Sequence, residues 1–316
     1  MTTEPRHSTI STNGIRMHIA EMGDGFPVIM LHGWPELWYS WRHQLPALAA
    51  AGYRAIAPDM RGYGGTDAPA DPREYTMKAV CADIAGLMDT LGLERAVVAG
   101  HDWGGAALWQ FALRYPDRVA GLIGLNTPYS PPSNARTTEV VRDAFGLTDR
   151  TFYMRYFLTE AAEREFEANV RTNLAKTFMP YTRCEDLWTF ATVGGDGSGC
   201  WTNIAPPDTF LTSAELDVYA EAFERTGIRG GFNWYRAADL NADEVDRPAG
   251  LVIDKPALMI TAEHDRILRP EMAAGMGQFM PNLSTEMVRN CSHWTQQERP
   301  DETNRLMLDF LSSLDL

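Results

Sequence analysis

The chain has 316 residues, 45% of them hydrophobic, and a formal net charge of −14. This composition can support one large packed domain or two smaller ones, and the acidic balance argues against nucleic acid or anionic membrane surfaces as partners. No window approaches the roughly 18 apolar residues of a membrane span, and residues 1–16 lack a signal-peptide core. We therefore expect a soluble, cytoplasmic protein.

Apolar runs alternate with helical patterns through the first 132 residues. The stretch from Met77 to Leu91 repeats apolar residues at the spacing of one helix face, and Gly92 follows as a stop signal. Strands that alternate with helices predict a mostly parallel central sheet with helices on both faces. We expect strands over residues 15–20, 27–31, 54–57, 97–100 and 121–125, and helices over 41–51, 77–91 and 106–113.

Residues 133–246 have a different pattern. They contain helical segments, clearest over 160–178 and 213–225, and no convincing core strand. We interpret this segment as a helical cap domain inserted between two strands. Caps of this kind close over the carboxyl edge of the sheet and exclude water.

The strand pattern resumes after the expected cap. Apolar runs predict strands over residues 257–261 and 285–288, and an amphipathic helix is expected over 305–314. The sequence therefore predicts a core domain that is formed by residues 1–132 together with residues 247–316.

One short motif joins the expected strand at 97–100 to the helix at 106–113. Gly100 and Gly104 each lie two residues from Asp102, and such a strand–turn–helix forces its central residue into a strained backbone conformation. We expect the Asp102 side chain to project from the carboxyl edge of the sheet. This pattern is the nucleophile elbow of α/β hydrolases, in which serine normally occupies the position of Asp102.

An aspartate in place of serine changes the chemistry that the elbow can perform. A carboxylate attacks without a base, works best on carbon with a strained or good leaving group, and forms an ester that water must cleave. Serine-type hydrolysis of amides or ordinary esters is therefore not expected. The alternative is structural, because Asp is a common N-cap and a helix is expected to follow Asp102.

A second landmark is the His-Gly-Trp-Pro stretch at residues 32–35, which follows the strand expected at 27–31. Glycine allows the backbone to approach a ligand closely, and a Trp–Pro bond can be cis at low cost. Such a turn can direct the amide of Trp34 into a pocket beside the elbow, where it would form an oxyanion hole with the amide of Trp103. We interpret His32 as a buried structural histidine.

Two polar residues follow the strands expected in the last part of the chain. Asp265 comes after the strand at 257–261, and His293 comes after the strand at 285–288. The order Asp102, Asp265, His293 is nucleophile, acid, histidine, which is the chain order of the α/β-hydrolase triad. Among the seven histidines of the chain, His293 alone lies late on a short loop between a strand and a helix. These landmarks together argue against a purely capping role for Asp102.

Six stretches carry a family resemblance over nearly the full chain. They are residues 32–35 (His-Gly-Trp-Pro), 100–104 (Gly-His-Asp-Trp-Gly), 152–157 (Phe-Tyr-Met-Arg-Tyr-Phe), 233–236 (Asn-Trp-Tyr-Arg), the turn at Asp265 and residues 293–296 (His-Trp-Thr-Gln). On these stretches the chain resembles an α/β-hydrolase-fold epoxide hydrolase of the soluble, bacterial type. The resemblance implies the α/β-hydrolase fold with an inserted helical cap, and opening of an epoxide to a vicinal diol.

The resemblance also places two tyrosines in the cap. In this family, two cap tyrosines hold the epoxide oxygen and protonate it as the ring opens. Matching of the motifs assigns these roles to Tyr153 and Tyr235. Tyr156 lies one helical turn from Tyr153 and remains an alternative for the first tyrosine.

The remaining roles follow from the same resemblance. Asp102 forms a covalent alkyl ester, His293 activates the water that hydrolyses it, and Asp265 orients the imidazole. The amides of Trp34 and Trp103 bind the oxyanion, and both residues, like the two tyrosines, contact the substrate. No metal or organic cofactor is expected. The expected partners are a small-molecule epoxide and water, without nucleic acid or membrane, in a monomer or homodimer.

Three other functions share part of this pattern. A haloalkane dehalogenase would use the same Asp-His-Asp triad, but Trp34 stands where an asparagine that binds halide is frequent. A fluoroacetate-type dehalogenase needs arginines beside the nucleophile, and residues 103–105 (Trp-Gly-Gly) provide none. A non-catalytic binding protein of the hydrolase fold would not need an intact triad. Release of halide against release of diol separates these alternatives.

Overall fold

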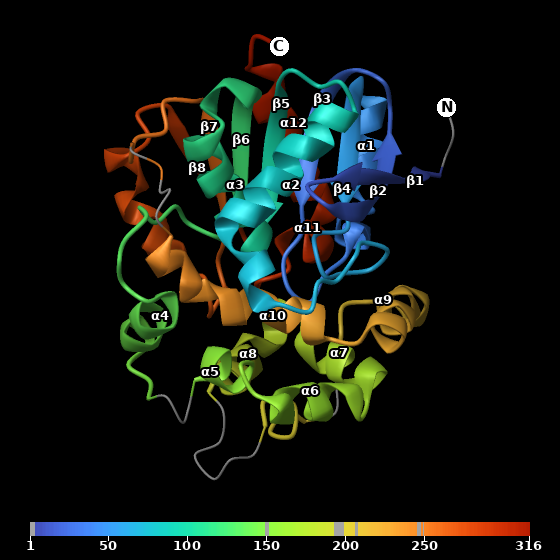
Figure 1. The fold of residues 1–316 in the computed structure, drawn as a ribbon, viewed down its shortest axis with the longest axis vertical. Helices are drawn as coiled ribbons and strands as arrows, with labels where there is room; N and C mark the ends of the chain where they lie inside the picture. Colours follow the sequence, from blue (N-terminus) through green and yellow to red (C-terminus); the bar gives the residue numbers. More distant parts are fainter. Residues whose placement is uncertain (1–3, 149–151, 193–198, 206–207, 245–247, 249) are drawn as a thin grey trace. The chain divides into compact units, whose positions relative to one another are not determined.

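The computed structural model describes residues 4–316 apart from 149–151, 193–198, 206–207, 245–247 and 249 (Figure 1). The chain divides into two compact units. The first unit comprises Met1–Asp67, Met77–Pro131 and Pro248–Leu316, and the second comprises Ala68–Thr76 and Pro132–Arg247. Within the described part of the chain, no helix is both long enough and apolar enough to cross a membrane.

The first unit is built on an eight-stranded sheet in the order β1-β2-β4-β3-β5-β6-β7-β8. The pairs β1–β2 and β2–β4 are antiparallel, and the remaining pairs are parallel. The mostly parallel sheet that the sequence predicts is therefore present. The strands are β1 (Arg6–Thr12), β2 (Ile15–Met22), β3 (Phe26–Leu31), β4 (Tyr53–Pro58), β5 (Ala96–His101), β6 (Val119–Leu125), β7 (Ala257–Ala262) and β8 (Leu283–Val288).

Helices cover both faces of this sheet. All residues of β5 and β7 are buried, which explains why parallel strands of this kind are continuous apolar runs in the sequence. Figure 1 shows α2 and α3 in front of the sheet and α12 behind it, where Leu306 and Met307 of α12 join the core with Leu45 of α1. The helices of this unit are η1 (Trp38–Trp41), α1 (Gln44–Ala50), α2 (Met77–Thr90), α3 (Trp103–Arg114), η3 (Pro116–Arg118), η6 (Pro270–Gln278), α11 (Thr295–Glu298) and α12 (Pro300–Ser312).

The strand order places a switch point between β3 and β5. From β3 the chain moves to β4 on one side, and β5 pairs with β3 on the other side. Ligand sites of open α/β sheets lie at the carboxyl ends of strands that flank such a point. The two landmarks at residues 32–35 and 100–104 lie at these two strand ends.

The described part of the second unit contains helices and turns but no strand. Its clearest helix, α9, starts with a capping box in which Thr212 and Glu215 bond each other's backbone amides, and it ends at Gly227. The helices are η2 (Pro72–Tyr75), α4 (Thr137–Phe145), α5 (Tyr153–Tyr156), α6 (Glu160–Glu167), α7 (Val170–Thr177), η4 (Tyr181–Arg183), α8 (Cys184–Ala191), α9 (Ser213–Thr226), α10 (Arg229–Ala238) and η5 (Leu240–Asp243).

The expectation that the strand at residues 15–20 comes first is wrong, because β1 precedes it. Strand β1 carries exposed side chains at most positions and therefore lacks an apolar run. The turn between β1 and β2 is Asn13-Gly14, with φ angles of 43° and 80°. This dipeptide is a strong signal for a two-residue hairpin turn, so the sequence did contain the information.

The single helix expected over residues 160–178 is also wrong. It is broken into α6 and α7 at Asn169, which has φ −157° and ψ 67°. The Asn173 side chain donates to the backbone carbonyls of Glu165 and Phe166, at 2.8 and 3.1 Å. These bonds satisfy carbonyls at the end of α6 that a continuous helix would have used.

Two helices of the first unit start at positions that differ from the prediction. Helix α12 begins at Pro300 rather than residue 305, and its first turn carries Asp301 and Glu302. Proline at the first position and acidic residues in the first turn are both typical helix starts. Helix α1 begins at Gln44 because the preceding residues form the separate 3-10 turn η1.

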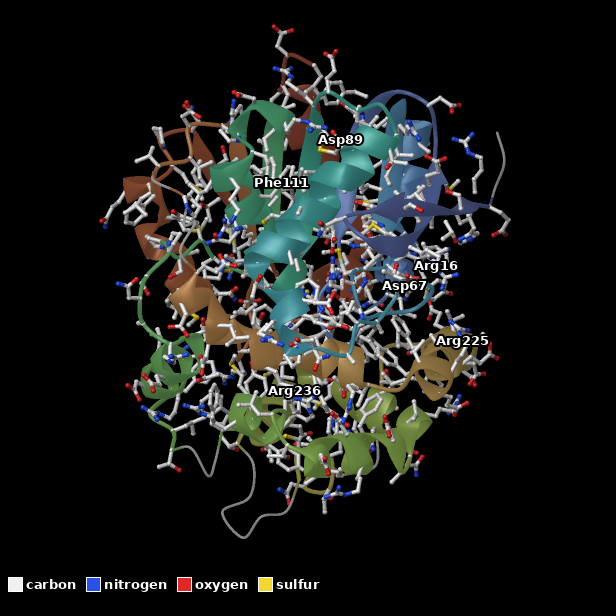
Figure 2. All side chains as sticks on the ribbon, viewed as in Figure 1. Arg16, Asp67, Asp89, Phe111, Arg225 and Arg236 are labelled. Carbon is white, nitrogen blue, oxygen red and sulfur yellow. The ribbon has the colours of Figure 1, made fainter. Side chains whose placement is uncertain are left out.

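Exposed ion pairs lie on the outside of the first unit. Figure 2 shows Arg16 of β2 beside Asp67, and the guanidinium donates to the carboxylate at 2.8 Å. The Arg16 side chain is 75% exposed, so water screens this pair and it contributes little to stability.

Candidate active site

Asp102 occupies a strained turn between β5 and α3. Its φ of 52° and ψ of −119° lie in a region that residues other than glycine rarely adopt. The turn closes tightly, because a Cβ on Gly100 would overlap the carbonyl of Gly104, and one on Gly104 would overlap the carbonyl of Leu31. Glycine is therefore required on both sides of Asp102.

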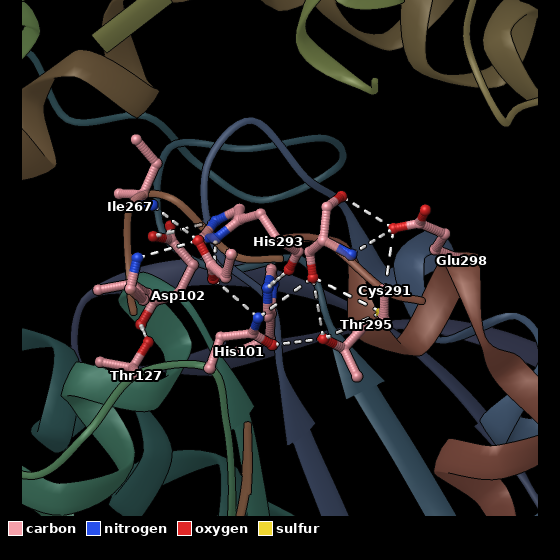
Figure 3. A network of polar contacts seen from close by, with 12 residues as sticks. His101, Asp102, Thr127, Ile267, Cys291, His293, Thr295 and Glu298 are labelled. Atoms are coloured by element: carbon pink, nitrogen blue, oxygen red, sulfur yellow. Dashed lines mark hydrogen bonds and ion pairs between the residues drawn. The ribbon is translucent and has the colours of Figure 1, made fainter. Parts of the chain in front are cut away.

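The carboxylate of Asp102 makes no cap hydrogen bond to α3. Instead, Oδ1 accepts from the backbone amide of Trp34 at 2.8 Å. The backbone carbonyl of Asp102 accepts from the Thr127 hydroxyl at 2.8 Å (Figure 3). The capping alternative therefore does not account for the side chain.

The turn after β3 brings its backbone directly against Asp102. A Cβ on Gly33 would overlap the Asp102 side chain, and the peptide bond between Trp34 and Pro35 is cis. This approach places the Trp34 amide on Oδ1. The second expected amide, that of Trp103, belongs to the first residue of α3, where the backbone N–H groups of the first turn point out of the helix.

His293 and Asp265 lie on the other side of the Asp102 carboxylate. His293 Nε2 is 3.7 Å from Asp102 Oδ2, and its Nδ1 is 2.9 Å from Asp265 Oδ2. Asp265 is buried and accepts from the amides of Ile267 and Leu268 at 2.8 and 2.9 Å. The structure thus brings together the three residues that the sequence singles out as a triad.

The charges of this group shift its protonation equilibria. Burial opposes the charged form of His293, but the carboxylates of Asp265 and Asp102 outweigh it and raise the pKa of His293 to about 9. Burial alone would raise the pKa of Asp265, yet the charge and hydrogen bond of His293 hold that pKa below its usual value. Asp265 is therefore an acceptor that stabilises the imidazolium form of His293.

Asn126 is a member of the site that the sequence analysis missed. It follows β6 with a φ of 63°, and its side-chain amide donates to Asp265 Oδ2 at 2.8 Å. Its Oδ1 accepts from the Thr295 hydroxyl at 2.7 Å, which connects Asp265 to the loop of His293. Asn126 directly follows β6, the neighbour of β5, and this position at the carboxyl edge of the sheet could have identified it from the sequence.

A buried, hydrogen-bonded pair of residues below the triad was also missed. Glu36 and His101 are fully buried, and the Glu36 carboxylate lies 2.7 Å from His101 Nδ1. His101 Nε2 donates to the backbone carbonyl of His293 at 2.7 Å, because a carbonyl can only accept. Gln296 and Gln297 both donate to Glu36 Oε1. This network connects the turn after β3 and the turn after β5 to the loop of His293.

His32 has a structural role, in line with its interpretation from the sequence. Its Nε2 accepts from the Met60 amide at 2.8 Å and its Nδ1 donates to the carbonyl of Gly33 at 2.8 Å. Burial lowers the pKa of His32, so both bonds are those of a neutral ring. Among the residues that the structure describes, no group of three or more His, Cys, Asp or Glu side chains is arranged to hold a metal ion.

The two expected tyrosines lie together within the second unit. Tyr153 starts α5 and Tyr235 lies on α10, and their ring centroids are 6.0 Å apart with the planes 77° from parallel. Tyr156 is engaged elsewhere, because its hydroxyl donates to Glu165 at 3.0 Å. Burial and the Glu165 carboxylate raise the pKa of Tyr156, which makes it a weaker acid than an ordinary phenol.

Comparison with known proteins gives close similarities over the whole chain. The family described as alpha/beta hydrolase fold matches residues 27–300. Epoxide hydrolase 3 of Siraitia grosvenorii is 38% identical, with 97% of this chain and 98% of the relative covered. Epoxide hydrolase A of Mycobacterium tuberculosis is 36% identical, with 99% of each covered.

The solved structures agree with these relatives. Epoxide hydrolase A from Mycobacterium thermoresistibile matches with a TM-score of 0.91 and 37% identity, over 99% of both chains.

A further relative is longer than this chain. Bifunctional epoxide hydrolase 2 of Mus musculus is 38% identical over 95% of this chain, but the match covers only 54% of that relative. The chain thus spans about half the length of this mammalian relative. The predicted α/β-hydrolase fold is confirmed by these similarities.

Proposed function

Because the chain belongs to the epoxide hydrolases of the α/β-hydrolase fold, we propose that it opens an epoxide to a vicinal diol through a covalent ester on Asp102. Attack and ester hydrolysis are assigned to the core domain of residues 1–132 and 247–316. Protonation of the ring oxygen is assigned to the cap domain of residues 133–246. The small-molecule epoxide and water are the proposed reactants.

One observation carries this proposal, namely the two different environments of the Asp102 carboxylate oxygens. Oδ1 accepts from the Trp34 amide at 2.8 Å, whereas Oδ2 faces His293 at 3.7 Å. In the first step Oδ2 attacks an epoxide carbon, and the bond between that carbon and the ring oxygen breaks. Oδ1 then becomes the carbonyl oxygen of the ester and keeps its backbone donor.

The ring oxygen needs a proton as its bond to carbon breaks, because a free alkoxide is costly. We assign this proton to Tyr153 or Tyr235, whose rings are neighbours in the cap with centroids 6.0 Å apart. General acid help of this kind supplies about 10²–10⁴-fold in rate. The bond from Tyr156 to Glu165 supports Tyr153 as the first tyrosine.

Water cleaves the ester in the second step. The 3.7 Å between His293 and Asp102 is too long for a direct hydrogen bond, and a water that attacks the ester carbonyl can pass its proton to His293 Nε2. Asp265 accepts from Nδ1 and stabilises the resulting imidazolium. The Trp34 amide, with that of Trp103, binds the tetrahedral oxyanion.

The two half-reactions give a direct test. His293→Gln should still form the ester but fail to hydrolyse it, because the carboxylate attacks without a base. With styrene oxide, intact mass spectrometry should find enzyme plus one substrate mass, and peptide mapping should place it on Asp102. His264→Gln is the matched control, since this histidine directly precedes Asp265 and has a side chain 38% exposed, and should leave no adduct.

An isotope experiment checks the same step in the wild-type enzyme. In a single turnover in ¹⁸O-water, the heavy oxygen should enter Asp102, and the first diol should carry the former carboxylate oxygen. Label that appears directly in the first diol, with no adduct in His293→Gln, would mean that water attacks the epoxide itself and that Asp102 is only a base. Halide release from a chloroalkane without any diol release would instead point to a haloalkane dehalogenase.

A further inference from the structure

Helix α5, which begins with Tyr153, is a single turn of four residues. A helix this short is not stable by itself, because the first turn fixes several dihedral angles for one hydrogen bond. Its direction must come from side-chain contacts of the residues on either side of Tyr153, among them Phe152, which is buried with its ring centroid 6.4 Å from that of Phe145 of α4. Arg155 lies 3.7 Å from Asp239 at the end of α10, and Tyr156 is bonded to α6.

Glu165 of α6 is the acceptor that holds Tyr156. Its Oε2 accepts from the Tyr156 hydroxyl at 3.0 Å, and its Oε1 accepts from the amide and hydroxyl of Thr202 at 2.8 and 2.7 Å. One carboxylate therefore joins α5, α6 and the turn at residues 200–203. Three donors converge on it, and a carboxylate can accept all of them.

The backbone beside Glu165 fits closely around this carboxylate. A Cβ on Gly199 would overlap both carboxylate oxygens of Glu165. The next residue, Cys200, is fully buried, and burial together with the Glu165 charge raises the pKa of its thiol. The glutamate is thus enclosed by the chain on this side, and its position is fixed.

The turn at residues 200–203 is linked to Tyr153 and Tyr235 through two aromatic rings. Trp201 is buried and stacks on Phe157, with ring centroids 5.7 Å apart. Phe157 directly follows α5, and its ring centroid is 5.4 Å from that of Tyr153 and 5.0 Å from that of Tyr235. A displacement of the turn therefore reaches both tyrosine rings through Trp201 and Phe157.

We propose that Glu165 is a positioning residue for Tyr153 in epoxide ring opening, an inference that rests on the function proposed above. Glu165 fixes the direction of α5 through Tyr156 and fixes the Trp201–Phe157 stack through Thr202. It acts only through these neighbours. Loss of the carboxylate therefore slows the step that needs Tyr153, formation of the ester, and leaves hydrolysis of the ester by His293 unchanged.

Two variants test the proposal in the full-length chain. Glu165→Gln keeps the size of the side chain but turns an NH₂ group toward one of the donors, and Tyr156→Phe removes only the hydroxyl. In single-turnover kinetics with styrene oxide, each should lower the rate of ester formation by about tenfold, as expected for a misplaced acid. The double variant should match the more impaired single variant, because Glu165→Gln and Tyr156→Phe both disturb the same contact between Tyr156 and Glu165.

The control is Glu160→Gln, a glutamate of the same helix with a side chain 76% exposed. It should leave both steps at the wild-type rate. Hydrogen–deuterium exchange gives a second readout that does not depend on activity. Exchange of the peptide over residues 152–158 should rise in Glu165→Gln and Tyr156→Phe, but not in Glu160→Gln.

The kinetic and exchange results together support or overturn the positioning role of Glu165. Faster exchange with slower ester formation and unchanged ester hydrolysis supports a positioning role. Equal slowing of both steps with a lowered melting temperature overturns it in favour of a general structural role, and unchanged exchange and kinetics overturn it outright. If the wild-type enzyme forms no ester with any epoxide, the proposed function fails, while the exchange arm still shows whether Glu165 fixes α5.

Discussion

The two units hold the side chains that we propose as reactive in different ways. In the first unit the backbone does so, because Asp102 sits at a positive φ between glycines whose close contacts exclude any other residue. In the second unit Tyr153 lies on a one-turn helix, and its place depends on the Phe157 ring and on the carboxylate of Glu165.

This difference predicts different responses to substitution. A backbone that is packed against another backbone has no space to adjust, since native interiors are close-packed. A side chain that is held by several partial contacts loses them one at a time. We therefore expect a substitution at the backbone contacts of the first unit to abolish activity and destabilise the fold together. A substitution in the second unit should lower activity in steps, according to which contact it removes.

The largest expected effect comes from removing both tyrosine hydroxyls. Tyr153→Phe combined with Tyr235→Phe should lower the rate of ester formation by about 10²–10⁴-fold, because the leaving alkoxide loses its acid. Each single variant should keep part of the activity, since one hydroxyl remains on the ring oxygen. Rapid-quench measurement of ester formation with an epoxide substrate checks both statements.

Tyr156→Phe is the matched control for the pair, because it removes a phenol from the same helix as Tyr153. Its effect should be far smaller than that of the double variant. Full activity in the double variant would move the acid role to another group, with Tyr156 the first candidate, and would break the proposed division of work between the units.

The next effect concerns the backbone of the first unit. A Cβ on Gly104 would overlap the Leu31 carbonyl and lie 2.7 Å from that of His32. Gly104→Ala should lower the free energy of unfolding by about 1–3 kcal/mol, the cost of overpacking, and should abolish turnover. Gly275→Ala is the control, because nothing lies within 4 Å of the position that its Cβ would take. Urea unfolding that finds both variants equally stable would contradict a backbone-fixed site.

Much of the first unit could be predicted from the sequence for the same physical reason. Strands β5 and β7 are buried on both faces and therefore appear as apolar runs. The tight turn at Asp102 requires glycines at fixed spacing, which makes it visible as a local motif. The pair of Glu36 and His101 was not predictable in this way, because its members lie 65 residues apart and no periodicity connects them.

The second unit was harder to predict because its contacts are between side chains. Spacing alone leaves Tyr153 and Tyr156 equivalent, and they are distinguished by the hydrogen bond from Tyr156 to Glu165 and by the ring contact of Tyr153 with Tyr235. The break between α6 and α7 depends on the Asn173 side chain, which bonds carbonyls seven and eight residues earlier. Propensity and apolar spacing do not encode such contacts.

A smaller effect concerns the protonation of His293. Its pKa is raised to about 9 from an ordinary value of about 6.5. Its charge therefore stabilises the fold fully below about pH 6.5, and that contribution is lost as the pH rises through about 9. Asp102→Asn removes one of the two nearest carboxylates, so NMR titration of the imidazole should find a lower pKa than in the wild type.

The same reasoning applies to the proposed ester intermediate, in which Asp102 would carry no charge. The pH profile of ester hydrolysis should therefore rise with an apparent pKa below that of the free enzyme. Glu263→Gln removes a partly exposed carboxylate that pairs with Arg289 and should leave the titration of His293 unchanged. An unchanged titration in Asp102→Asn would mean that Asp265 alone sets the pKa of His293.

The smallest effect compares one arginine from each unit. In the second unit, Arg236 of α10 (Figure 2) has a side chain 16% exposed and donates to Glu163 and to Asn233. Arg236→Ala should lower the free energy of unfolding by about 1 kcal/mol, because the buried Glu163 and Asn233 side chains lose a donor. Arg16→Ala in the first unit should cause no measurable change, since water screens its exposed pair with Asp67. Urea unfolding of both variants, with exchange of the peptide over residues 229–238, measures the difference. Equal effects would mean that side-chain pairs matter as much for the first unit as for the second, and the contrast between backbone-held and side-chain-held sites would not stand.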